Sequence, residues 1–202
     1  MVTSSGHKSV RHSWGEADFV GGHPVLDFLN TVADTGKTRD CDKLRDWPAV
    51  RAWASLSGLL SDTEHGRFLG DQSLDGHREL AELHRFREDA YMVMLRVVGD
   101  EATRSAALAR LHDRIRAALG RGRLEHHGLH FKWRASPSTR RRWTDAVALA
   151  YEEFLRSDDL ARVRQCARCT WFFVDRGRGV GRRWCDMRTC GNRAKMAAFR
   201  CT

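Results

Sequence analysis

The stretch CARCTWFFVDRGRGVGRRWCDMRTC, residues 166–190, decides how the C-terminal part of this 202-residue chain folds. It holds four of the six cysteines, in the order CxxC, fifteen residues and CxxxxC. The two-residue gap lets Cys166 and Cys169 direct both thiolates at one ion, and Cys185 and Cys190 supply a second pair. Four thiolates favour zinc over metals that prefer oxygen ligands. We predict one structural Zn²⁺, because closed tetrahedral coordination leaves no position for a substrate or an activated water.

Other cysteine chemistries fit this stretch less well. A thioredoxin-like redox pair would begin a helix, whereas Cys169 is followed by the strand pattern of residues 170–174. An iron–sulfur cluster is not excluded by the spacing alone. Unligated core cysteines would not explain why four of six lie so close together. The segment between the two pairs has a length suited to a β-hairpin, and zinc binding can contribute on the order of 10 kcal/mol to folding.

Charge is concentrated around the same cysteines. Residues 162–200 hold eleven Lys and Arg against two acids, while the rest of the chain balances, so the whole formal excess of +9 lies here. Such asymmetry indicates a polyanionic partner, with DNA as the leading candidate. The run GNRAKMAAFR after Cys190 predicts a helix that starts at the metal, where Gly191 gives space beside the ion. The candidate nucleic-acid contacts are Arg176, Arg178, Arg182, Arg183, Asn192, Arg193, Lys195 and Arg200.

Structural roles are open for two of these candidates. Asn192 could cap the helix or bond a ligand sulfur, and Arg193 could fold back onto a carbonyl or onto Asp175. The metal site also reduces the local charge, because four thiolates and one Zn²⁺ together add −2. A positive excess remains, so the prediction of a polyanionic partner is unchanged.

The segment from about residue 165 to residue 200 closely resembles the CGNR zinc-finger family. The family pattern joins CxxC, W-x-F-x-D, R-R-W-C and CGNR-x-K, and each element is present. Upstream, GGHPVLDFLNTV (21–32) is similar to the start of the ABATE domain, which is associated with stress-induced transcription regulation. The resemblance implies that the four cysteines are the zinc ligands and that the protein regulates transcription.

The upstream part predicts a mainly α domain over residues 16–158, preceded by a disordered tail at 1–15. Helical patterns run over 24–32, 46–56, 76–98 and 103–119 and from Ser138 to Phe154, with a capping box at Ser61 and Glu64. The apolar faces of the longest two include Val97 and Leu108, and Gly120 is the expected C-cap of the second. Alternation over 123–134 predicts one small β-hairpin with a turn at His127–Gly128. A small treble-clef-like or ribbon-like zinc module with four cysteine ligands follows at 159–202.

Three polar residues of the first helix form a candidate ligand pocket, namely His23, Asp27 and Asn30. Helix capping explains them more simply, and the chain has no phosphate-binding glycine loop, nucleophile elbow or zinc-protease helix. We therefore predict a non-enzymatic DNA-binding regulator with a helical sensing or dimerisation domain. One alternative is a zinc-stabilised module that binds proteins or RNA, and another is an enzyme or small-molecule-binding protein that uses the N-terminal domain.

The expected partners and location follow from the same features. They are DNA, a second copy of the chain and a small-molecule effector, but no membrane, because no apolar run approaches the ~18 residues of a transmembrane helix. The N-terminus lacks the apolar core of a secretory signal, which predicts a cytoplasmic protein. Cys41 and Cys201 are expected to be free thiols.

Overall fold

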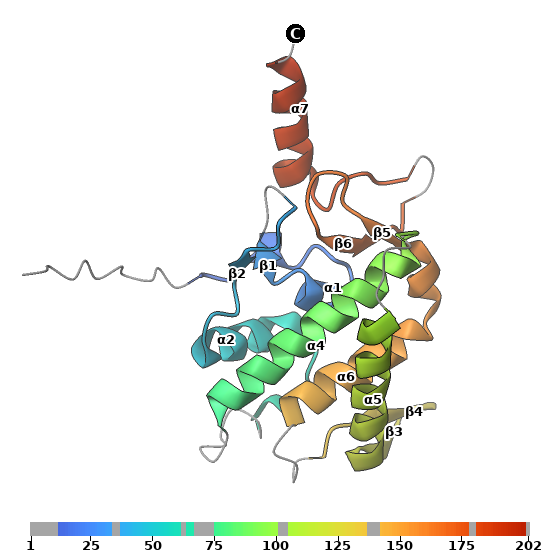
Figure 1. Cartoon of the computed structure of the whole chain (residues 1–202). Coiled ribbons are helices and arrows are strands. Elements are labelled where there is room, and N and C mark those ends of the chain that lie inside the picture. The colour runs from blue at the N-terminus through green and yellow to red at the C-terminus, as the bar shows by residue number, and fades with distance from the viewer. Residues whose placement is uncertain are drawn as a thin grey trace, which may run out of the picture.

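The computed structural model describes residues 12–33, 37–61, 64–66, 75–100, 105–136, 142–177 and 181–200. It is mainly helical, as predicted, and carries a small cysteine cluster near the C-terminus (Figure 1). The main helices are α1 (Pro24–Leu29), α2 (Trp47–Ser57), α4 (Gly76–Val97), α5 (Ser105–Arg121), α6 (Arg142–Leu155) and α7 (Asn192–Phe199).

The predicted helix starts in the N-terminal part are confirmed by their caps. Asp46 accepts the Ala49 N–H at 2.8 Å and begins α2, and His23 accepts the Val25 N–H at 3.2 Å and begins α1. The capping box at Ser61 also forms, with reciprocal bonds to Glu64. These caps satisfy N–H groups that have no partner within the helix, so local sequence is enough to place the helix starts.

The core lies between α1, α4 and α6, where Tyr151 of α6 is fully buried and donates to the Ala90 carbonyl of α4 at 3.0 Å. The predicted end of the α4 stripe is wrong, because Val97 is exposed. The stripe of α5 is also displaced: Leu108 faces solvent, while Ala107, Leu111 and Ala118 are buried. Small alanines allow α5 to approach α4 and α6 closely. The expected cap Gly120 lies inside α5, which continues to Arg121.

In the part of the chain that the structure describes, the strands form three separate antiparallel pairs. They are β1 (Val32–Ala33) with β2 (Cys41–Asp42), β3 (Arg123–His127) with β4 (His130–Arg134), and β5 (Val163–Gln165) with β6 (Phe172–Val174). The β3–β4 hairpin is the predicted one, but His127 pairs with His130, so its turn is Gly128–Leu129. Gly128 has a φ of 63°, which suits the first position of a type II′ turn.

The position of the third strand pair corrects a prediction. The hairpin expected between the two cysteine pairs instead brackets the CxxC, with Cys166 and Cys169 between β5 and β6. The reason is hydrophobic: Val163, Phe172 and Val174 belong to the same buried cluster as α1, α4 and α6. The metal module therefore shares the main core with the helices.

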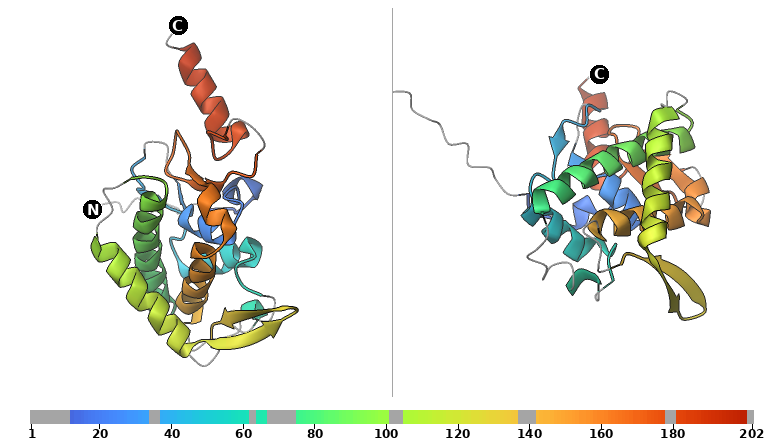
Figure 2. Two further views of the ribbon diagram at one scale, coloured as in Figure 1. Left: turned by 90° about the vertical axis from the view of Figure 1, so that its right-hand side faces the viewer. Right: turned by 60° about the horizontal axis from the view of Figure 1, so that its bottom comes forward.

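Two parts of the molecule project from the body. Helix α7 extends from the cysteine end, and the β3–β4 hairpin projects near the other end (Figure 2). Every described residue of α7 is at least partly exposed. No helix within the described residues is long and apolar enough to cross a bilayer.

The N-terminal tail is only partly as predicted. Residues 1–11 lie outside the described residues, as do Ser138, Arg178 and Cys201. Residues 12–15 contradict the prediction of disorder, because Trp14 packs against Phe19 and His12 contacts Asp18 at 3.2 Å. Cys41 is exposed, with a free thiol.

Candidate metal centre and the basic helix beside it

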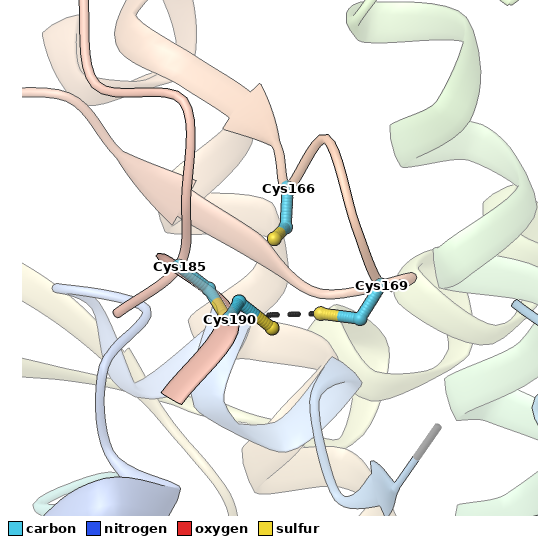
Figure 3. A group of neighbouring side chains, drawn as sticks. All are labelled: Cys166, Cys169, Cys185 and Cys190. Atoms are coloured by element: carbon cyan, nitrogen blue, oxygen red, sulfur yellow. Dashed lines mark hydrogen bonds between the residues drawn. The ribbon is translucent and has the colours of Figure 1, made fainter. Parts of the chain in front are cut away.

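Four cysteine side chains meet beneath the base of α7 (Figure 3). The sulfurs of Cys166, Cys169, Cys185 and Cys190 all lie within 4.8 Å of one another, and all four residues are buried. The Sγ atoms of Cys169 and Cys185 are 3.7 Å apart. A tetrahedral zinc with bonds of about 2.3 Å places its sulfurs roughly 3.8 Å apart, so the donor set has the size that zinc requires.

The first pair of cysteines is held by backbone hydrogen bonds. The Cys166 N–H donates to the Trp171 carbonyl at 2.9 Å, and the Arg168 N–H donates to the Cys166 sulfur at 3.5 Å. The Ala167 N–H donates to the Arg183 carbonyl at 2.9 Å, which ties this turn to the chain entering Cys185. Phe173, Trp171 and Trp184 pack around the sulfurs and limit access of water.

Without a compensating cation, the thiols of Cys166, Cys169 and Cys185 compete for ionisation. Hydrogen bonds from Cys169 and Cys185 lower the pKa of Cys166. Its thiolate then raises the pKa of Cys169 to about 12, chiefly through the hydrogen bond that Cys169 donates to it, and raises that of Cys185 in the same way. A bound dication would attract all four thiolates and remove this conflict. Geometry and charge therefore both fit one structural zinc ion.

The comparison with known families agrees with this geometry. Residues 162–201 match the model of the CGNR zinc finger. The C-terminal module is a CGNR zinc finger. No curated protein matches the chain. The four cysteines thus hold one structural zinc, as predicted from their spacing.

The second cysteine pair of the CGNR finger leads directly into α7. Cys190 lies in a single π-helical turn, Met187–Gly191, which begins where the Asp186 carboxylate accepts the Arg188 N–H at 3.0 Å and continues into α7. A side chain at Gly191 would lie 2.7 Å from the Met187 sulfur and 3.2 Å from Trp184. The glycine therefore gives space to Met187 and Trp184, which corrects the expectation that it makes room for the ion.

A clamp formed by the GGHPVLDFLNTV segment, residues 21–32, fastens the CGNR finger to the helical body. Asn30 is buried, donates to the Phe172 carbonyl at 2.8 Å and accepts the Phe172 N–H at 2.9 Å. The Val174 N–H donates to the Gly21 carbonyl at 2.8 Å. The Trp171 indole donates to the Val32 carbonyl at 2.7 Å. The sequence alone does not reveal this clamp, because its partners are about 140 residues apart along the chain.

The three candidate pocket residues have separate partners in this clamp region. His23 caps α1 and its ring packs on Phe154 with centroids 4.4 Å apart, and burial lowers its pKa. Asp27 accepts the Gly21 N–H at 2.8 Å, and burial raises its pKa to about 7. Asn30 holds the CGNR finger. In the structure each of the three side chains therefore has a hydrogen-bond partner within the protein.

Three of the predicted nucleic-acid contacts interact with other residues of the protein. Arg176 bonds the Gly22 carbonyl at 3.0 Å and pairs with Asp159 at 2.5 Å, which links the finger to the body. Arg182 bonds the Trp184 carbonyl at 2.7 Å and lies over the Phe173 ring. Arg183 is exposed and lies 5.2 Å from the Trp184 ring. Arg182 and Arg183 remain at the surface, whereas the hydrogen bonds of Arg176 favour a structural role.

The candidates on α7 differ from these in their surroundings. Arg193, Lys195 and Arg200 are exposed and form no side-chain hydrogen bond or ion pair with the described residues. Asn192 instead donates to the Arg188 carbonyl at 3.2 Å, a structural contact that differs from the helix cap and the sulfur bond considered for it. Arg188, with 71% of its side chain exposed, is a basic residue that the sequence prediction omitted. The position of Arg188 between Cys185 and Cys190 was a sequence signal that could have identified it as a candidate contact.

Proposed function

We propose that the protein is a DNA-binding transcription regulator in which the CGNR finger presents α7 to duplex DNA. The observation that carries the proposal is a group of exposed basic side chains, unpaired among the described residues, on a helix that projects from the body (Figures 1 and 2). Arg193 and Arg200 are seven residues apart and therefore share one face of α7. A projecting helix can enter the major groove, which is about 12 Å wide, without the body obstructing it.

The metal gives this helix its position. An isolated helix of eight residues is not stable in water, because nucleation costs more than so few hydrogen bonds return. Cys190 fixes the turn before α7 to the metal, and the clamp fixes the finger to the body. The body would then act as a sensing or dimerisation domain, since a change in α1 reaches the finger through Asn30.

DNA binding can be tested with zinc-loaded full-length protein. The fluorescence anisotropy of two labelled duplexes of equal length and different sequence is measured at about 50 and about 200 mM salt. We expect binding that weakens with salt, and the R193Q/K195Q double variant should reduce the slope of log K against log salt by about 1.8, or roughly 0.9 for each lost contact. The control R116Q removes the charge of an exposed Arg of α5 and should leave binding to both duplexes unchanged.

Two results would contradict the proposal. One is no binding to either duplex at low salt, and the other is a double variant that behaves like the control. Zinc content and circular dichroism are compared for all three proteins, so a loss of binding can be attributed to the lost charges and not to loss of the fold.

A second candidate is a zinc-stabilised module that binds acidic proteins or RNA. Exposed Met187, Met196 and Phe199 favour it, because apolar side chains beside basic ones are typical of protein interfaces. A labelled acidic peptide and a single-stranded RNA replace the duplexes in the same assay. Binding to either one without binding to duplex DNA would favour this candidate over the first.

A further inference from the structure

The β3–β4 hairpin presents its apolar face to solvent. Leu124 pairs with Trp133 and His126 with Phe131, so these four side chains share one face of the two-stranded sheet. The exposed fractions are 54% for Leu124, 40% for Trp133 and 66% for Phe131, and Leu129 at the turn is 95% exposed. Single exposed apolar residues are common, but four in one short hairpin form a patch.

The polar face of the same hairpin contacts the body. Lys132 of β4 pairs with Glu153 of α6 at 2.9 Å, and Arg134 contacts Glu64 at 3.4 Å. Neighbouring side chains on a strand point to opposite faces, so the ion pairs on one face direct Leu124, Phe131 and Trp133 outward. The described part of the body therefore does not cover the apolar face.

The size of the patch points to a protein partner. Aromatic side chains present about 150–250 Å² each, so the four apolar residues together expose on the order of 500 Å². A standard interface buries about 800 Å² on each partner, and this patch would supply more than half of that area. A two-stranded hairpin is also marginally stable until its apolar face is covered.

We propose that this face is a self-association surface, covered by the same face of a second copy of the chain. A twofold contact places the same patch of both copies against each other, so two patches of this size would together bury on the order of 1,000 Å², about the least that a specific interface needs. The centre here is formed by Leu124, Phe131 and Trp133. Arg123 and Glu125, which pair with each other at 2.9 Å on β3, belong by strand alternation to the opposite, polar face and leave this centre apolar.

The arrangement of the molecule permits this contact. The hairpin projects from the body, and α7 projects near the opposite end (Figures 1 and 2). A dimer formed through the hairpins leaves α7 of each copy exposed. The inference goes beyond DNA binding and is tested without DNA, so either proposal can fail alone.

The test uses sedimentation velocity of the zinc-loaded full-length protein over a range of concentrations. We expect a monomer–dimer equilibrium whose Kd rises at least tenfold in F131K. The matched control is L56K, because Leu56 is an apolar residue of similar exposure, 59% on α2, that is not part of the hairpin. L129K provides a second variant at the turn, where a change of side chain cannot disturb folding, and it should weaken the dimer in the same direction.

Hydrogen exchange supplies a local readout. Amides of residues 123–134 should gain protection as wild-type concentration rises, and should not do so in F131K. A protein that stays monomeric at the highest concentration overturns the proposal. A dimer that F131K and L129K weaken no more than L56K does also overturns it, because the contact would then lie elsewhere on the chain.

Discussion

Replacing Asn30 by alanine should release the CGNR finger from the helical body. The Asn30 carboxamide makes two hydrogen bonds to the Phe172 backbone, and both partners are buried. Alanine leaves one N–H and one carbonyl without partners, at about 1–3 kcal/mol each. We expect the free energy of unfolding of the zinc-loaded protein to fall by about 2–6 kcal/mol. A loss of about 3 kcal/mol corresponds to a decrease in Tm of about 6–12 °C for a chain of this length.

The measurement is urea unfolding followed by circular dichroism, with Asn192→Ala as the matched control. Asn192 makes one exposed hydrogen bond, so its loss should cost less than about 1 kcal/mol. Asn30→Asp keeps an acceptor for the Phe172 N–H but turns an oxygen toward the Phe172 carbonyl. It should therefore destabilise the protein at least as much as Asn30→Ala does. If Asn30→Ala costs no more than Asn192→Ala, the clamp does not hold the finger as we argue.

Three further predictions concern the clamp and the metal. Gly21→Ala should destabilise the protein by about 1–3 kcal/mol, because the new Cβ would lie 2.8 Å from the Asp27 carboxylate and 2.9 Å from Leu26. Gly191→Ala should destabilise it less, since the Met187 side chain can move away from the new Cβ. Thermal unfolding of the two variants compares these effects. Burial raises the pKa of Asp27 to about 7, so the stability that its protonated form contributes is lost as pH rises through that value. From about pH 6 to about pH 8, the free energy of unfolding of the wild type should fall by about 1.4 kcal/mol relative to that of Asp27→Asn. If the free energy of unfolding of both proteins depends on pH in the same way, this prediction is contradicted. Treatment with EDTA should remove exchange protection from α7 before α4 and α6, and full protection of α7 in the metal-free protein would exclude a structural zinc.

Much of the metal centre could be predicted from sequence, because its ligands are local. The spacing of Cys166 and Cys169 fixes a turn, and Cys185 and Cys190 complete a donor set whose sulfurs the structure brings within 4.8 Å. Helix starts such as Asp46 were equally predictable, since a cap bonds an N–H three residues away. These features depend on short stretches of chain and little on tertiary packing.

The features that sequence could not supply are those decided by distant contacts. The burial of α5 through Ala107 and Ala118 depends on how closely it approaches its neighbours, which periodicity does not reveal. The different roles of Arg176 and Arg193 also depend on distant contacts. Both are basic residues in one short segment, but Asp159 and the Gly22 carbonyl bind the first while the second faces solvent. Charge counting identified the segment and could not assign roles within it.

The contacts around the metal separate the stability of the body from the position of α7. Phe172 and Val174 belong to the main core, so β6 has hydrophobic reasons to stay in place without zinc. Helix α7 has no buried residue and contacts the preceding turn that contains Cys190. Zinc is therefore more important for α7 than for the body. If α7 contacts DNA as proposed, chelation should abolish DNA binding at metal concentrations at which the helical body is still folded.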